Sequence, residues 1–284
     1  MIWLYQTIAL FIAIGLNLLF GASGATQAID RFGIRLISWL ENAVYPEYPG
    51  QKTLIQRGLV FSLLLLIGGY VLLTAILAVL YHFIWPLAMV IEAFLLWQVI
   101  DLRHFGDRAE IVANDLKHAD LFAARVHLSY ISDAETAHMN EGDVIAATLE
   151  TIEENTIERV VAPLFYLFFL GTPGAVVYRI LRLLPERLPP ELDRYRFFAK
   201  HPLAINQIIR FIPEKIGTAL LAHAATFFER GIGVFRRFRD GQTVMSNDIK
   251  RGVRASRLTA VFLIAISFVF KAAFVVVLRL TTSP

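Results

Sequence analysis

Leu59 to Tyr81 read LVFSLLLLIGGYVLLTAILAVLY, an apolar run without a charged side chain. A helix of about 20 such residues crosses the hydrocarbon core of a bilayer. Ile2 to Gly21 and Leu258 to Leu280 have a similar character. A fourth apolar segment, His82 to Ile100, follows the first directly, and we expect Pro86 to break the helix between them. These segments predict an all-α integral membrane protein with about four transmembrane helices.

The composition agrees with a chain that lies partly in lipid. Of the 284 residues, 56% are hydrophobic and only 18% are charged, whereas a typical globular domain has about 25% charged residues. The mean hydropathy is +0.57. There is no cysteine, which excludes disulfides, thiolate metal sites and a cysteine nucleophile. Because 27 basic and 24 acidic residues nearly balance, we do not expect nucleic acid as a partner. The long apolar runs predict the lipid bilayer as one.

A fifth apolar stretch, Val160 to Leu181, is interrupted. Pro163 lies near its start, and Gly171-Thr172-Pro173-Gly174 divides it. Neither piece is long enough to cross about 30 Å of hydrocarbon at about 1.5 Å per residue. We therefore predict a re-entrant hairpin that enters and leaves the bilayer on the cytoplasmic side, with a single crossing as the alternative.

Charged residues divide the rest of the chain. Short cytoplasmic loops retain Lys and Arg, which assigns the polar segments to the cytoplasm. The predicted order is an N-terminal membrane region with three spans (1–100), an acidic cytoplasmic segment of amphipathic helices (101–159), the re-entrant hairpin (160–181), a basic cytoplasmic segment (182–257) and a C-terminal span (258–284). We expect a multi-pass protein of the bacterial inner membrane.

The densest polar feature is a row of carboxylates. Glu150, Glu154 and Glu158 are four residues apart, so on a helix they share one face and repel one another. A hard cation would neutralise them, and magnesium commonly bridges one or two carboxylates to substrate phosphates. Glu150 and Glu154 are therefore candidate Mg²⁺ ligands, and a solvated helix face is the alternative. His118, Asp120 and His127 do not match a common spacing of metal ligands.

One charge lies deep inside a predicted span. Lys271 is thirteen residues into the last span, where an ammonium costs about 2.5–3.5 kcal/mol. The only carboxylate inside another predicted span is Glu92. Intramembrane charges usually pair inside the helix bundle, so we predict that Glu92 and Lys271 approach one another. The alternative is a lone lysine that extends to the membrane surface.

The sequence around the carboxylate row resembles a known family. Leu149 to Tyr166 read LETIEENTIERVVAPLFY, and Gly171 to Gly174 and Tyr178-Arg179 follow. This block resembles the central signature of the CobD/CbiB family, the membrane-bound adenosylcobinamide-phosphate synthases of cobalamin biosynthesis. Ala123-Ala124-Arg125 is also similar, and the resemblance covers most of the chain.

The resemblance implies a specific chemistry. Family members form an amide between a corrinoid carboxylate and aminopropanol or its phosphate. An active member of this type would be an ATP- and Mg²⁺-dependent ligase with a corrinoid or other small ligand. The resemblance implies catalytic roles for Glu150, Glu154 and Asn155. It also implies ligand- or phosphate-binding roles for three more residues, Arg125, Tyr178 and Arg179.

Several family motifs are replaced in this chain. Asp133-Ala134-Glu135-Thr136 stand in place of Gly-Arg-Asp-Thr, and Leu203 to Gln207 stand in place of Ala-Arg-x-Asp-Asp. Similar losses are typical of the related AmpE branch, inner-membrane proteins associated with β-lactamase induction. We therefore predict a non-catalytic, AmpE-like signalling or partner-binding membrane protein, with another membrane protein or a second copy as its partner. A divergent amide-forming synthase of the cobalamin pathway is the alternative, and magnesium is the one cofactor that the residues suggest.

Overall fold

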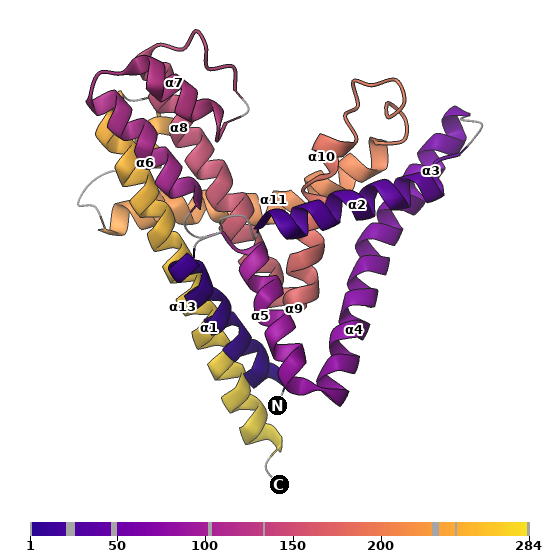
Figure 1. The fold of residues 1–284 in the computed structure, drawn as a ribbon. Helices are drawn as coiled ribbons and strands as arrows, with labels where there is room; N and C mark the ends of the chain where they lie inside the picture. Colours follow the sequence, from indigo (N-terminus) through magenta and orange to yellow (C-terminus); the bar gives the residue numbers. More distant parts are fainter. Residues whose placement is uncertain are drawn as a thin grey trace. The chain divides into compact units, whose positions relative to one another are not determined.

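A computed structural model describes residues 2–20, 26–46, 50–101, 104–132, 134–228, 233–241 and 243–282 (Figure 1). These residues form helices joined by short connections, and none of them lies in a β-strand. The predicted all-α class is confirmed. The chain divides into two compact units, residues 1–101 with 165–213 and residues 102–164 with 214–284.

The first unit is built around the apolar helix pair α4 and α5. Its helices are α1 (Ile2–Phe20), α2 (Thr26–Val44), α3 (Gln51–Leu63), the π-helix η1 (Leu64–Gly68), α4 (Gly69–Phe83), α5 (Trp85–Val99), most of α9 (Ala162–Leu181), α10 (Leu184–Arg187) and the start of α11 (Lys200–Phe228). Ile84, with φ −142° and ψ 67°, separates α4 from α5, and Pro86 opens α5. The predicted break at Pro86 is confirmed.

Helix α5 holds this unit together. It packs against α1, α2 and α4. Asn17 of α1 donates a hydrogen bond from its amide to the carbonyl of Ile100, just after α5 ends. A second close contact in this unit joins α3 to the segment before α11. Gly58 of α3 makes it possible, because a Cβ there would overlap the carbonyl oxygen of Phe198. The ring of Phe198 lies 5.4 Å from the ring of Tyr45 and 5.4 Å from that of Phe61.

Among the residues that the structure describes, three helical segments are long and apolar enough to cross a membrane. They are Gln51–Phe83, Glu141–Arg187 and Ser246–Val269, and shorter apolar helices cover Thr7–Asn17 and Trp85–Val99. The predicted first span corresponds to α1, which has 19 residues, and the predicted span His82 to Ile100 corresponds to α5, which is shorter than expected. Helix α5 has 15 residues and is about 22 Å long, because Ile84 and Pro86 delay its start.

Helix α9 turns back on itself. Gly171 has φ 71° and ψ −170°, a conformation that side-chain-bearing residues rarely adopt. The rings of Tyr166 and Tyr178 stack with centroids 5.1 Å apart. In a straight helix these two residues would be separated by about 18 Å along the axis. The chain therefore forms a hairpin at the predicted Gly-Thr-Pro-Gly sequence. Its entry and exit on one side of a bilayer stay a prediction.

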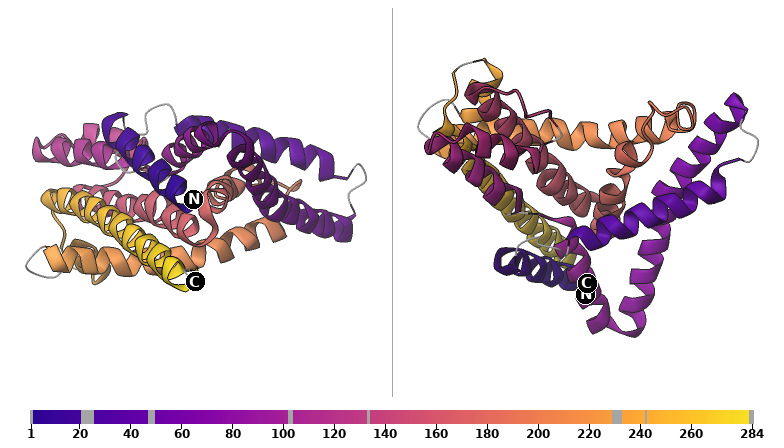
Figure 2. Two further views of the ribbon diagram at one scale, coloured as in Figure 1. Left: turned by 90° about the horizontal axis from the view of Figure 1, so that it is seen from below. Right: turned by 45° about the horizontal axis from the view of Figure 1, so that its top comes forward.

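The second unit carries most of the polar segments. Its helices are α6 (His104–Lys117), α7 (Leu121–Ser129), α8 (Glu141–Thr156), the π-helix η2 (Ile157–Val161), the rest of α11, α12 (Val234–Arg239) and α13 (Ser246–Thr282). Helix α13 packs along α6 and α8 (Figure 2). Asn140 and Asp143 form a capping box at the start of α8. Gly252 of α13 faces Leu149, whose Cδ2 would lie 3.0 Å from an added Cβ.

Candidate functional site

The carboxylate row lies on the outer face of α8. Glu150 and Glu154 are exposed, and Glu158 is partly exposed one turn further on, in η2. Asn155 is engaged within its own helix. Its Nδ2 donates to the Thr151 carbonyl at 2.9 Å, and its Oδ1 accepts from Nε of Arg159 at 2.6 Å. Both ends of this carboxamide are thus used along the helix.

A neighbouring carboxylate that the sequence did not single out faces inward. Glu153 is partly buried, and its Oε1 lies 3.5 Å from Nη2 of Arg239 on α12. The same guanidinium group donates to the carbonyl of Thr218 at 3.2 Å. Glu153 therefore ties α8 to α12, and no spacing rule could have paired residues this far apart in sequence.

Glu150 and Glu154 were the predicted magnesium ligands. Within the described ranges, no group of three or more His, Asp or Glu side chains is placed to hold a metal ion. The two exposed carboxylates fit Mg²⁺ only if oxygens of a phosphate ligand complete its coordination, which is a common arrangement for magnesium. A magnesium site there stays a prediction.

Arg125, Tyr178 and Arg179 were the predicted ligand- or phosphate-binding residues. In the second unit, Nε of Arg125 donates to the carbonyl of Met139 at 2.7 Å, which fastens α7 to the segment before α8. In the first unit, Arg179 is 1% exposed, and its Nε and Nη2 each donate to the Asp30 carboxylate at 2.8 Å. The stack with Tyr166 fixes the ring of Tyr178. These contacts are internal to each unit, and ligand binding by the three residues stays a prediction.

Glu92 occupies the centre of the first unit. It is fully buried, and its two oxygens accept hydrogen bonds from the hydroxyl groups of Tyr81 on α4 and Thr172 at the hairpin tip. The side chain of Lys271, its predicted partner, lies outside the described residues, so that pair stays a prediction. Sequence reasoning missed Thr172, although its place between Gly171 and Pro173 marks it as part of a tight turn.

An apolar cavity lies between α4 and the hairpin. Its volume is about 300 Å³, at the lower end of the range typical of small-molecule sites. Six of the side chains that line it are Leu66, Ile67, Tyr70, Tyr166, Leu170 and Tyr178. Part of this wall is the π-helix η1, a distortion that is frequent at functional sites. Such a lining suits a hydrocarbon group.

A polar cluster holds the segment after α10. Arg194 and Tyr195 both donate to Oε1 of Glu41, at 2.8 Å and 2.9 Å. The guanidinium of Arg194 also lies 4.8 Å from the centre of the Tyr45 ring. Burial, and then the hydrogen bond to the Glu41 carboxylate, raise the pKa of Tyr195 above its usual value. The cluster is a candidate for a structural role.

Comparison with known proteins matches nearly the whole chain to one family. A family model described as "CobD/Cbib protein" matches residues 10–282. The cobalamin biosynthesis protein CobD of Chromobacterium violaceum is 31% identical over 225 residues, which cover 76% of this chain and 70% of that protein.

More distant relatives match in part. The cobalamin biosynthesis protein CobD of Clostridium tetani is 28% identical over 70% of this chain. The cobalamin biosynthesis protein CbiB of Salmonella typhi is 25% identical over 67% of it. The chain spans 62% and 60% of the lengths of these two relatives. No solved structure matches the chain.

Proposed function

The chain belongs to the CobD/CbiB family, and on that premise we propose that it is a non-catalytic, AmpE-like membrane protein that binds a partner or small ligand. The observation that carries this proposal is the state of Asn155, whose carboxamide is engaged by Thr151 and Arg159 of its own helix. A catalytic amide has to reach its substrate. The two hydrogen bonds of Asn155 instead run along the helix where α8 passes into η2.

The second candidate is a divergent amide-forming synthase of the cobalamin pathway. One observation favours it: Glu150 and Glu154 are exposed one turn apart on α8, where Mg²⁺ could bridge them to a phosphate. The relatives are named cobalamin biosynthesis proteins, which points the same way.

Complementation separates the two candidates. The chain would be expressed in a bacterium that lacks its own CobD/CbiB protein, with the Chromobacterium violaceum relative as the positive control. We expect no recovery of corrinoid production, and no amide product by mass spectrometry from purified protein given cobyric acid, aminopropanol phosphate, ATP and Mg²⁺. Recovery that Glu154→Gln abolishes would establish the synthase instead.

The same variant reports on magnesium. If the carboxylate row is a solvated face, removing one repelling charge by Glu154→Gln is neutral or slightly stabilising. Thermal unfolding in detergent would then respond to Mg²⁺ equally in the two proteins. A Mg²⁺-dependent stabilisation that only the wild type shows would support ligation by Glu150 and Glu154.

We place the protein in the bacterial inner membrane with several crossings and with the α9 hairpin re-entrant. Because the chain has no cysteine, single cysteines at Ser132 and Leu192 can report their side of the membrane. Leu192 is 55% exposed, which makes it accessible to a thiol reagent. We expect both positions to be labelled from the cytoplasmic face. Labelling of the Leu192 position from the periplasmic face would show that the hairpin crosses.

A further inference from the structure

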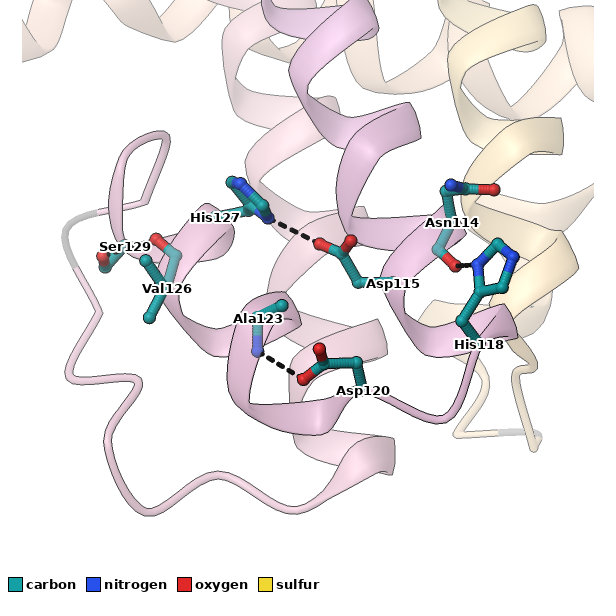
Figure 3. Close-up of polar contacts among 8 residues, drawn as sticks. All are labelled: Asn114, Asp115, His118, Asp120, Ala123, Val126, His127 and Ser129. Atoms are coloured by element: carbon teal, nitrogen blue, oxygen red, sulfur yellow. Dashed lines mark hydrogen bonds and ion pairs between the residues drawn. The ribbon is translucent and has the colours of Figure 1, made fainter.

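His127 and Asp115 form a pair in the second unit that none of the functions above uses (Figure 3). Nδ1 of His127 on α7 lies 2.6 Å from Oδ2 of Asp115 on α6. The Asp115 side chain is 18% exposed and that of His127 is 40% exposed. The carboxylate of Asp115 is thus the more buried partner, and the ring of His127 is the more exposed one.

The other two residues of the predicted spacing do not join this pair. Nδ1 of His118 lies 2.8 Å from the carbonyl of Asn114 on its own helix, and Figure 3 shows its ring turned away from His127. The carboxylate of Asp120 accepts from the Ala123 amide at 2.9 Å and caps α7. One imidazole remains, which is too few ligands for a transition-metal site.

The pairing determines which nitrogen of His127 is available. An ionised carboxylate can only accept hydrogen bonds, so Nδ1 carries the proton that Asp115 binds. Nε2 lies at the far side of the ring from Asp115, and among the described residues it makes no hydrogen bond. Asp115 is therefore a positioning residue that presents Nε2 of His127 to whatever lies beyond the ring.

A hollow lies beside the ring. Its volume is about 320 Å³, and it is lined by Arg108, Ile111, His127 and Tyr130. The one contact that Arg108 makes within the described residues is a long 3.4 Å hydrogen bond to the carbonyl of Tyr130.

The carboxylates nearest to Arg108 in sequence are already engaged. Asp107 and Glu110 pair with Arg257 of α13, at 2.9 Å and 3.1 Å. No carboxylate of the described chain forms an ion pair with Arg108. The hollow is thus bordered by a guanidinium group without an acidic partner and by an oriented imidazole.

We infer that this hollow binds a phosphate group. A guanidinium fork donates two parallel hydrogen bonds to phosphate oxygens, and the interaction is charge-assisted. Nε2 of His127 can accept from a protonated phosphate oxygen or, once protonated, donate to an ionised one. The phosphate belongs either to a soluble phosphate ester or to a phospholipid headgroup. The inference holds whichever function proposed above is correct.

Imidazole NMR of the full-length protein tests the site directly. The protein would be labelled with ¹⁵N-histidine, purified in an uncharged detergent and titrated with inorganic phosphate and then with glycerol 3-phosphate. We expect a saturable shift of the Nε2 signal that His127→Gln removes. Arg108→Gln should weaken the affinity about tenfold or more, because the variant loses a charge-assisted hydrogen bond to the phosphate. Arg108 is exposed, so this variant should fold.

Matched controls lie in the same unit. Arg254→Gln removes an exposed arginine that does not line the hollow, and His118→Gln removes a histidine bound to its own helix. Both should bind phosphate like the wild type. Asp115→Ala should abolish the Nδ1–H tautomer signature of His127 and weaken binding. An unchanged tautomer would overturn the positioning role of Asp115.

Vesicles distinguish the two sources of the phosphate. A shift with glycerol 3-phosphate in lipid-free detergent supports a soluble ester. A shift that appears only with phosphatidylcholine vesicles containing phosphatidic acid supports a headgroup. If neither probe shifts the His127 signal, or if Arg254→Gln weakens binding as much as Arg108→Gln does, the inference is wrong.

Discussion

In the first unit, Arg179 is 1% exposed and forms a bidentate ion pair with the carboxylate of Asp30 through two of its nitrogens. In the second unit, Arg257 bonds to Asp107 and Glu110 while its side chain is 43% exposed. The chemical groups are the same, but water competes for only one of the two guanidinium groups. A buried charge that loses its partner costs several kcal/mol, whereas an exposed pair is worth little. Burial therefore decides which of these pairs maintains the fold.

Removing the buried guanidinium should have the largest effect. Arg179→Met leaves the Asp30 carboxylate without its partner, and we expect a loss of about 3 kcal/mol in the free energy of unfolding. Denaturant titration in detergent would measure it. Arg179→Lys keeps the positive charge but cannot form the bidentate pair, so it should recover only part of the lost free energy of unfolding. Full stability of the lysine variant would contradict this account.

The hairpin tip should come second. Thr172→Val deprives a buried oxygen of Glu92 of its donor, and we expect a loss of about 1.5–3 kcal/mol in the free energy of unfolding. Thr74→Val is a matched control, because the hydroxyl of Thr74 is exposed and donates only to the carbonyl of Tyr70 on its own helix. Equal losses in the two variants would show that the bond from Thr172 to Glu92 has no special weight.

The same measurement tests the pair predicted from the sequence. Glu92→Leu and Lys271→Leu would be combined in a double mutant. If the two residues meet, the double mutant should recover most of the stability that the single mutants lose. Additive losses would show that they act independently, with Tyr81 and Thr172 as the partners that matter to Glu92.

The exposed pair should matter little. Arg257→Gln should cost about 0.2–1 kcal/mol, and the difference from the wild type should shrink in high salt. Thermal unfolding at low and high ionic strength would measure both. A loss as large as that of Arg179→Met would remove the contrast between the two units.

The smallest effect should appear at alkaline pH. A tyrosine whose pKa is raised by folding stabilises the protein fully below the unfolded pKa of about 10 and loses that contribution as the pH rises through its folded pKa. The pKa of Tyr195 is raised by burial and then by Glu41. Above about pH 10, the free energy of unfolding should therefore fall less steeply with pH in Tyr195→Phe than in the wild type. If stability falls equally steeply with pH in the wild type and in Tyr195→Phe, the pKa of Tyr195 does not contribute to the pH dependence of stability.

Local patterns predicted much of this molecule. The charge-free run at Leu59 to Tyr81 indicated a membrane helix, and Gly171 with Pro173 indicated the break in α9. The bonds of Asn155 could also have been predicted, because Thr151 and Arg159 lie four residues to either side of it.

Tertiary partners could not be predicted in this way. Asp30 and Arg179 are 149 residues apart, and helical spacing indicates the face of a side chain but not the element that packs on it. The same holds for Glu153 and Arg239. The hollow beside His127 depends on α6 and α7 lying side by side, a contact that no motif encodes.

The distance along the chain from Glu92 to Thr172 has a consequence for biosynthesis. The two residues are 80 positions apart. At about 5–20 residues per second, the ribosome delivers the hydroxyl group about 4–16 s after the carboxylate. The nascent chain must shelter an acidic side chain in an apolar helix during that interval. Tyr81 is synthesised eleven residues earlier, so its hydroxyl group is already present to donate a hydrogen bond to Glu92. The α4–α5 pair can therefore enter the membrane with one oxygen of the Glu92 carboxylate already hydrogen-bonded.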